Sequence, residues 1–143
     1  MQITFYFNVL NREKALCQLV GKSLAAGKTV CVLTESAAAT AALDRLLWEV
    51  PQNGFVPHCA ADDPRAARTP VIVDHRAELL PANEVLFNWT GQVSANWSRH
   101  ARVIEIVDSD EDRLVASRQR WRAYQALGHQ PDGIDMQERT RHG

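Results

Sequence analysis

The sequence predicts an α/β fold, a three-layer α/β/α sandwich with a largely parallel sheet. Strand-like and helix-like segments alternate along the first half of the chain. One short strand segment, residues 29–34 (TVCVLT), is apolar on both faces, which is typical of a sheet covered by helices on both sides. The 143 residues, 45% hydrophobic and 23% charged, correspond to a single globular domain.

The first strand and the first helix follow from residue type and spacing. Residues 3–8 (ITFYFN) are β-branched and aromatic, which suits a strand. Asn11 can cap a helix that runs to about Ala26, because apolar residues recur there at helical spacing. Gly27 ends this helix as a C-cap glycine would, and the strand over 29–34 follows.

A second helix and three further strands complete the pattern. Thr34 or Ser36 can cap the helix, which ends near Trp48, and residues 51–69 form a long connection. Further strands are expected at 70–74, 84–88 and 102–107, with a turn and a short helix over 89–100. Right-handed crossovers between parallel strands then produce the layered sandwich.

The last helix is expected from about residue 110 to Gly128. Acidic residues crowd its start and a glycine closes it, as the helix dipole and C-cap rules favour. We therefore expect one domain over residues 1–129, followed by a polar, flexible tail over 130–143.

Charge, hydropathy and cysteine content exclude several classes of protein. With 16 Lys and Arg against 17 Asp and Glu, the net charge of −1 argues against a general nucleic-acid binder. The sequence shows neither a membrane-spanning apolar run nor a secretion signal, so we expect a cytoplasmic protein. Cys17, Cys31 and Cys59 are odd in number and far apart, which predicts buried, reduced thiols.

Two short motifs resemble the end of a phosphate-binding loop. Residues 21–23 (GKS) and 27–29 (GKT) both lack the glycine that such a loop needs five residues earlier. The first lies inside an expected helix and the second leads into a strand, so their amides would not face a phosphate. We therefore expect a Rossmann-like fold with no nucleotide site and no cofactor. A small nucleotide-binding enzyme of this fold stays open as an alternative.

The candidate catalytic and metal-binding groups are weak. His58 lies beside Cys59, but adjacent side chains rarely face one another, so a histidine bonded to loop backbone is the better interpretation. Asp62 and Asp63 fit a solvated turn before Pro64 better than a metal site. We expect no catalytic residue and no metal, and hence no enzyme.

The last helix concentrates cationic and aromatic side chains. These residues are Arg113, Arg118, Arg120, Trp121, Arg122 and Tyr124. Arg118 and Arg122 are four residues apart and repel each other on a helix unless an anion lies between them. Two guanidinium groups beside an aromatic edge suit a carboxylate joined to an apolar side chain. The alternatives are a solvated cationic face near the helix C-terminus and direct binding of single-stranded DNA.

A second candidate surface combines residues 46–48 (LLW) with residues 55–58 (FVPH). The pattern fits a small hydrophobic cluster under the long loop or, equally well, a patch that binds a partner protein.

The order and spacing of five short motifs resemble the chi subunit of bacterial DNA polymerase III holoenzyme, over residues 3–136. The motifs are TFY at 4–6, LDxxLW at 43–48, FVPH at 55–58, VIEIV at 103–107 and RxRWRxYxxxG at 118–128. The loop at 59–64 (CAADDP) lacks glycines that are common in relatives, which leaves its shape open.

The resemblance implies a non-catalytic accessory subunit of the clamp-loader complex in DNA replication. It implies two partners, the psi subunit in a heterodimer and the acidic C-terminal tail of single-stranded DNA-binding protein, which ends in Pro-Phe with a free carboxylate. The tail would be bound by Arg118, Trp121, Arg122 and Tyr124. The psi subunit would be bound by Trp48, Phe55 and Pro57.

Overall fold

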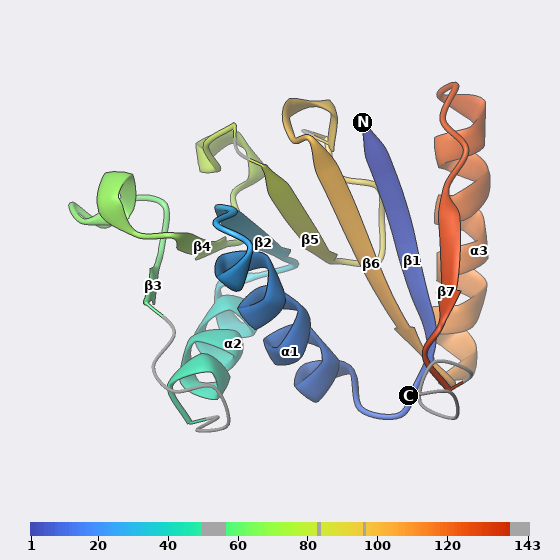
Figure 1. The fold of residues 1–143 in the computed structure, drawn as a ribbon, viewed down its shortest axis with the longest axis horizontal. Coiled ribbons are helices and arrows are strands. Elements are labelled where there is room, and N and C mark those ends of the chain that lie inside the picture. Colours follow the sequence, from blue (N-terminus) through green and yellow to red (C-terminus); the bar gives the residue numbers. More distant parts are fainter. Residues whose placement is uncertain (50–56, 83, 96, 138–143) are drawn as a thin grey trace.

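A seven-stranded, all-parallel sheet lies between helical layers in the computed structural model, which describes residues 1–49, 57–82, 84–95 and 97–137 (Figure 1). The strands are β1 (Gln2–Val9), β2 (Val30–Thr34), β3 (His58–Cys59), β4 (Val71–Asp74), β5 (Val85–Trp89), β6 (Arg102–Asp108) and β7 (Asp132–Asp135). The helices are α1 (Arg12–Ala25), α2 (Ala37–Glu49) and α3 (Glu111–Ala126), with short 3₁₀ turns at 66–68, 77–79 and 97–99. The predicted fold class is confirmed.

The two faces of the sheet have separate hydrophobic cores. Helices α1 and α2 pack on one face, where Leu16, Leu43 and Phe87 belong to one buried cluster. Helix α3 packs on the other face, where Phe5 and Tyr124 belong to a second cluster. Because β1 supplies side chains alternately to both clusters, it anchors both layers.

The strand order β3-β4-β2-β5-β6-β1-β7 places the first strand next to the last two. Residues Gln2–Tyr6 of β1 pair with Arg102–Ile106 of β6, and Thr4–Phe7 pair with β7 on the other side. Helix α3 connects β6 to β7, so it lies over the β1 end of the sheet (Figure 1).

The helix ends form where the capping residues predict. Asn11 Oδ1 accepts the backbone N–H of Lys14 at 2.9 Å. Ser36, rather than Thr34, caps α2 by accepting the N–H of Ala39 at 3.1 Å. Asp110 caps α3 in the same way, and Gly128 follows that helix with φ of +90°, a value that glycine tolerates.

Two strands were not expected from the sequence. Strand β7 lies within the segment that we expected to be a polar, flexible tail, and β3 lies in the long connection. Both are edge strands, which pair on one side only. An edge strand needs little apolar patterning, so the sequence DGID of β7 carries no strand signal. Ile134 of β7 and Met136, just after the strand, pack against the core under α1.

The helices and the cysteines of the described residues can be compared with the sequence predictions. None of the described helices has the length and apolar character needed to cross a membrane. Cys17, Cys31 and Cys59 are buried and none of them takes part in a disulfide among the described residues, which agrees with the prediction of buried thiols.

Candidate functional site

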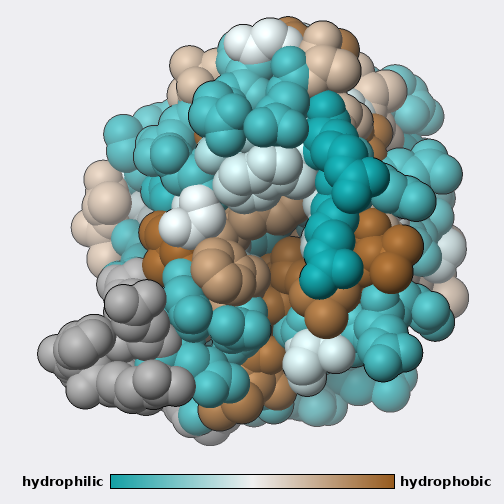
Figure 2. All heavy atoms as spheres, turned by 90° about the vertical axis from the view of Figure 1, so that its right-hand side faces the viewer, coloured by the Kyte–Doolittle hydropathy of each residue, from teal (hydrophilic) through white to brown (hydrophobic). Residues whose placement is uncertain are grey.

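A hollow of about 450 Å³ lies between α3 and the carboxyl end of β1. It is lined by Phe5, Phe7, Asn8, Val107, Leu114, Ser117, Arg118, Trp121 and Arg122. Figure 2 views the side of the molecule on which α3 and β7 lie, and shows apolar side chains next to strongly hydrophilic ones. We call this hollow the α3 pocket. It brings together three of the four residues implied as a tail-binding set.

Aromatic side chains form one wall of the α3 pocket. The ring centroids of Phe5 and Trp121 are 5.1 Å apart, with the ring planes at 56°. Phe7, two residues along β1 from Phe5, is 36% exposed. The backbone of β7 runs close by, because a β-carbon on Gly133 would lie 3.2 Å from the Phe7 ring and 3.8 Å from Trp121. The pocket therefore offers rigid apolar surface that is partly open to solvent.

Two arginines on α3 supply positive charge at this wall. Arg118 and Arg122 are exposed and both line the α3 pocket. Neither forms an ion pair with any acid in the described part of the chain. Like charges four residues apart on a helix cost a few tenths of a kcal/mol, about 0.2–0.5. A bound anion would remove this repulsion and accept charge-assisted hydrogen bonds from both groups.

The other two arginines of the helix are already paired. Arg113 donates from Nη2 to Asp108 at 2.7 Å, near the start of α3. Arg120 is buried, and its Nε donates to Glu105 Oε1 at 3.1 Å. The cluster of four arginines seen in the sequence therefore leaves two, Arg118 and Arg122, for an external anion.

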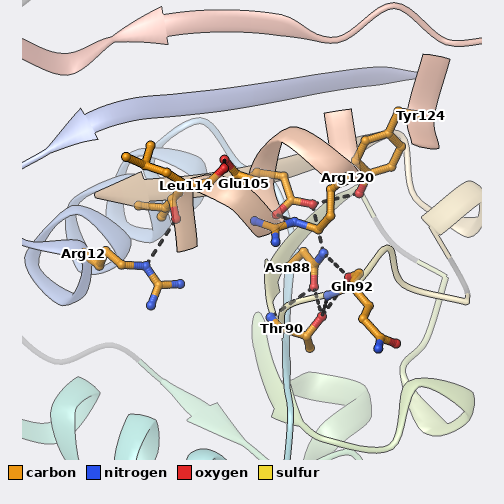
Figure 3. A network of polar contacts seen from close by, with 10 residues as sticks. Arg12, Asn88, Thr90, Gln92, Glu105, Leu114, Arg120 and Tyr124 are labelled. Carbon is orange, nitrogen blue, oxygen red and sulfur yellow. Dashed lines mark hydrogen bonds and ion pairs between the residues drawn. The ribbon is translucent and has the colours of Figure 1, made fainter. Parts of the chain in front are cut away.

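A buried polar network fixes α3 against the sheet (Figure 3). Glu105, on β6, is fully buried and accepts from Arg120, from Tyr124 Oη at 2.9 Å and from Asn88 Nδ2 at 2.9 Å. Asn88, on β5, also donates to the carbonyl of Gln92 at 2.8 Å. One carboxyl group thus connects β5, β6 and α3.

Glu105 is a buried carboxyl group surrounded by hydrogen-bond donors. Burial raises the pKa of Glu105 above its ordinary value, although the charge of Arg120 and the hydrogen bonds from Asn88 and Tyr124 act in the opposite direction. All three partners donate to the carboxyl oxygens, which is the pattern that a carboxylate needs. Burial, and then the neighbouring Glu105, raise the pKa of Tyr124, so its hydroxyl keeps its proton and acts as a donor.

Tyr124 differs from the expected tail-binding set because it lies in the core. Its side chain is fully buried and does not line the α3 pocket. Positions Ser117, Arg120 and Tyr124 are three and four residues apart and face the sheet together, whereas Arg118 and Arg122 lie on the outer side of the helix. Tyr124 therefore supports the helix rather than contacting a ligand.

The sequence analysis missed the wall that β1 contributes. Phe5 and Phe7 lie two residues apart on one face of the strand, opposite in direction to Tyr6. The signal in the sequence was the alternation of aromatic residues, Phe5 and Phe7, toward the end of the first strand. Leu114, one turn before Arg118, adds an apolar contact from α3.

The second predicted surface is described only in part. Phe55 lies outside the described residues, and Trp48 belongs to α2 with its side chain also outside them. Pro57 is exposed, immediately before β3. His58 is buried, and its Nε2 lies 3.2 Å from the carbonyl oxygen of Asp44 and 3.0 Å from the Asp44 carboxylate, which ties β3 to α2.

The loop that follows β3 is held by a buried aspartate. Asp74 accepts from the backbone N–H of Ala61 at 3.0 Å and from Arg76 Nε at 2.9 Å. Arg76 also reaches Asp62, at 3.3 Å. Burial alone would raise the pKa of Asp74, but the hydrogen bonds from Arg76 and Ala61 lower it well below its ordinary value. These contacts fix a loop whose shape the sequence left open.

We expect the Asp74→Asn variant to be less stable than the parent protein by about 1–3 kcal/mol near neutral pH. Because the pKa of Asp74 is lower in the folded state than its ordinary value of 3.8, ionised Asp74 stabilises the folded state at pH values above 3.8. This contribution is lost progressively as the pH falls below 3.8. Urea denaturation at about pH 6 and about pH 2.5 should show the difference shrinking in acid. Asp63, which is partly exposed and bonded to Arg65, supplies the control: Asp63→Asn should give a smaller change. An equal loss for Asp74→Asn at both pH values would contradict the assignment.

The described residues carry no sign of a metal centre, since they contain no group of three or more His, Cys, Asp or Glu side chains that could hold an ion. Asp63 instead pairs with Arg65, whose side-chain and backbone hydrogen bonds lower the pKa of Asp63 to about 2. This agrees with a turn rather than with a metal-binding pair.

Together, the fold and the α3 pocket define a small α/β protein whose site is a helix surface suited to binding an acidic, apolar-ended group. Comparison with known proteins gives the family. Residues 1–132 match the family described as DNA polymerase III chi subunit, HolC, and the chain belongs to this family.

Two relatives carry the name DNA polymerase III subunit chi. The protein of Haemophilus influenzae is 24% identical over 120 residues, which is 83% of each chain. The protein of Escherichia coli K12 is 23% identical over 117 residues, 81% of this chain and 80% of the relative. The resemblance stated from the sequence motifs is thereby confirmed at the level of the family.

Proposed function

We propose that this chain is a non-catalytic, cytoplasmic accessory subunit of the DNA polymerase III clamp-loader complex. It joins that complex, through psi, to the acidic C-terminal tail of single-stranded DNA-binding protein. The family supports the assembly. The observation that supports binding of the tail is the α3 pocket. In this pocket Arg118 and Arg122 lie beside an aromatic wall and have no acid partner among the described residues.

The proposed ligand matches the pocket in charge and shape. The terminal carboxylate of the tail would lie between Arg118 and Arg122, because a guanidinium group donates in a planar fork that suits a carboxylate. The terminal phenyl ring would pack against Trp121 and Phe7, with Phe5 behind them. The ring adds apolar burial, and the carboxylate fixes its position.

Such a site should bind weakly and exchange rapidly. One carboxylate clamp and one aromatic contact correspond to a Kd on the order of micromolar, roughly −8 kcal/mol. Many tails on a protein-coated single strand would raise the local concentration and so compensate for weak individual contacts. Salt should weaken binding, because the guanidinium groups are exposed.

Calorimetric titration with a tail peptide that ends in Pro-Phe tests the proposal. The peptide with a free C-terminal carboxylate should bind, and the same peptide with an amidated terminus should bind at least about tenfold more weakly. A single-stranded oligonucleotide serves as the third ligand and should not compete with the peptide. Equal affinity for the free and amidated peptides would contradict the carboxylate clamp, and competition by the oligonucleotide would favour direct DNA binding.

We expect Trp48→Ala to reduce copurification with a psi-like partner and to leave tail binding unchanged. Trp48 lies in the last turn of α2 and the exposed Pro57 lies just before β3, and neither residue lines the α3 pocket. Leu127→Ala, a change of an exposed apolar residue after α3, provides the control and should retain the partner. Loss of the folded state in Trp48→Ala would show instead that Trp48 belongs to the core.

A further inference from the structure

A second hollow, also of about 450 Å³, lies at the amino ends of β1, β5 and β6, beside the last turns of α1. Its lining includes Tyr6, Leu19, Lys22, Lys28, Glu84 and Arg102. We call it the amino-end pocket. Its apolar residues belong to the core under α1 and α2, so it opens on the face of the sheet opposite to the α3 pocket.

The amino-end pocket contains an arginine with unused donors. Arg102 donates from Nη2 to Tyr6 Oη at 3.2 Å and to Thr4 Oγ1 at 3.4 Å. Its Nε is buried and has no hydrogen-bond partner among the described residues. Buried polar groups, and charged ones above all, are costly when unpaired. Arg102 also lines the pocket, so an anion bound there would lie next to this guanidinium group.

The charges around this pocket do not cancel. Lys28 Nζ lies 3.0 Å from Glu84 Oε2, so these two residues neutralise each other. Lys22 and Arg102 remain, and neither pairs with an acid in the described part of the chain. The pocket therefore keeps about two positive charges.

The lysines are not needed to cap α1. The backbone N–H groups of Ala26, Gly27 and Lys28 already donate to the last carbonyl groups of that helix, at 2.9–3.1 Å. Lysine side chains near a helix C-terminus can serve the same purpose, but here the backbone does so. The side chain of Lys22 is therefore not required to cap the carbonyl groups at the end of α1.

The two motifs that failed as a phosphate-binding loop meet at this pocket. Lys22, from residues 21–23 (GKS), and Lys28, from residues 27–29 (GKT), both line it. The hydroxyl group of Ser23 donates to the carbonyl of Leu19 at 3.0 Å, inside the helix. The arrangement therefore offers side-chain cations rather than the cradle of backbone amides that a phosphate-binding loop supplies.

We propose that the amino-end pocket binds a phosphomonoester of nucleotide size, with the phosphate held by Arg102 and Lys22. A phosphomonoester carries about −1.5 to −2 charges at neutral pH, which matches two unpaired cations better than a single carboxylate does. Leu19 and Ile104 also line the pocket, so part of its lining is apolar, which suits a base or another flat body. The volume lies within the range of small-molecule sites, roughly 300–1,000 Å³.

An NMR titration of the ¹⁵N-labelled protein tests this site, with thymidine monophosphate, thymidine, inorganic phosphate and a 5′-phosphorylated oligonucleotide as probes. Thymidine monophosphate should cause saturable shifts of the Arg102 Nε–Hε signal and of amides near Lys22. Thymidine and inorganic phosphate should bind at least about tenfold more weakly, because each lacks half of the recognised group. The phosphorylated oligonucleotide separates two sources of the same chemistry: shifts matching those of the monophosphate indicate a strand end, and their absence indicates a free nucleotide.

Two variants and a control complete the experiment. Lys22→Ala and Arg102→Lys should each weaken thymidine monophosphate binding about tenfold, while Lys14→Ala, at the other end of α1, should not. Lys22 is exposed, so its variant tests the site even if Arg102→Lys alters the fold. The proposal is overturned if thymidine monophosphate causes no saturable shift, if thymidine binds equally well, or if Lys22→Ala binds as the parent does.

Discussion

Replacing both Arg118 and Arg122 with alanine should weaken binding of the tail peptide about a hundredfold. Each guanidinium group would donate charge-assisted hydrogen bonds to the same carboxylate, and the loss of one such contact costs about 1.5–3 kcal/mol, or at least tenfold in affinity. Both side chains are exposed and support no described ion pair, so the fold should be unaffected. Calorimetric titration with the free-acid peptide measures the loss, and Arg122→Ala alone should account for about tenfold of it.

Arg113→Ala is the matched control for this experiment. It removes the same functional group from the same helix, but Arg113 pairs with Asp108 and does not line the α3 pocket. Arg113→Ala should change peptide affinity by less than about twofold, because salt screens the long-range attraction between this charge and the acidic peptide. If the double variant retained the parent affinity, the site would have to lie elsewhere. If Arg113→Ala weakened binding equally, only the net charge of the protein would matter.

Glu105→Gln should lower the free energy of unfolding by about 3–5 kcal/mol, the usual cost of removing one partner from a buried ion pair. The change keeps the size of the side chain but leaves Arg120 buried without a counter-charge. The amide nitrogen of glutamine would also face donors, because Arg120, Tyr124 and Asn88 all donate toward this position. Urea denaturation at neutral pH measures the difference.

The same substitution at an exposed ion pair separates burial from charge. Glu84 pairs with Lys28 at 3.0 Å, and both side chains are about half exposed. Glu84→Gln should cost no more than about 1 kcal/mol, as exposed pairs usually do. Comparable losses for Glu105→Gln and Glu84→Gln would show that the network around Glu105 does not hold α3 in place.

Much of the fold could be predicted because its central strands are continuous apolar runs between recognisable helix caps. Residues 30–34 are buried throughout, the cap at Asn11 lies where the sequence indicates, and the last helix begins close to the expected residue 110. Strands β3 and β7 could not be predicted, because edge strands obtain their pairing from the sheet rather than from their own composition. Their positions depend on long-range contacts that no local pattern records.

The α3 pocket could be predicted only in part, because the sequence does not show which arginines have partners. Arg113, Arg118, Arg120 and Arg122 look alike along the chain, yet among the described residues only Arg113 and Arg120 have an acid partner. The informative signal was Glu105, a single acid in the middle of an apolar strand, which requires a buried cation and hydrogen-bond donors. Recognising that requirement would have assigned Arg120 and Tyr124 to the core.

The two walls of the α3 pocket come from opposite ends of the chain, residues 5–8 of β1 and residues 114–122 of α3. During synthesis, the β1 residues of the pocket are made first. More than a hundred further residues must be added before the α3 residues of the pocket are made. A nascent or truncated chain that lacks α3 can therefore present neither the cationic clamp nor the closed aromatic wall. The pocket that we propose for the tail therefore forms only after residues 114–122 of α3 have been synthesised.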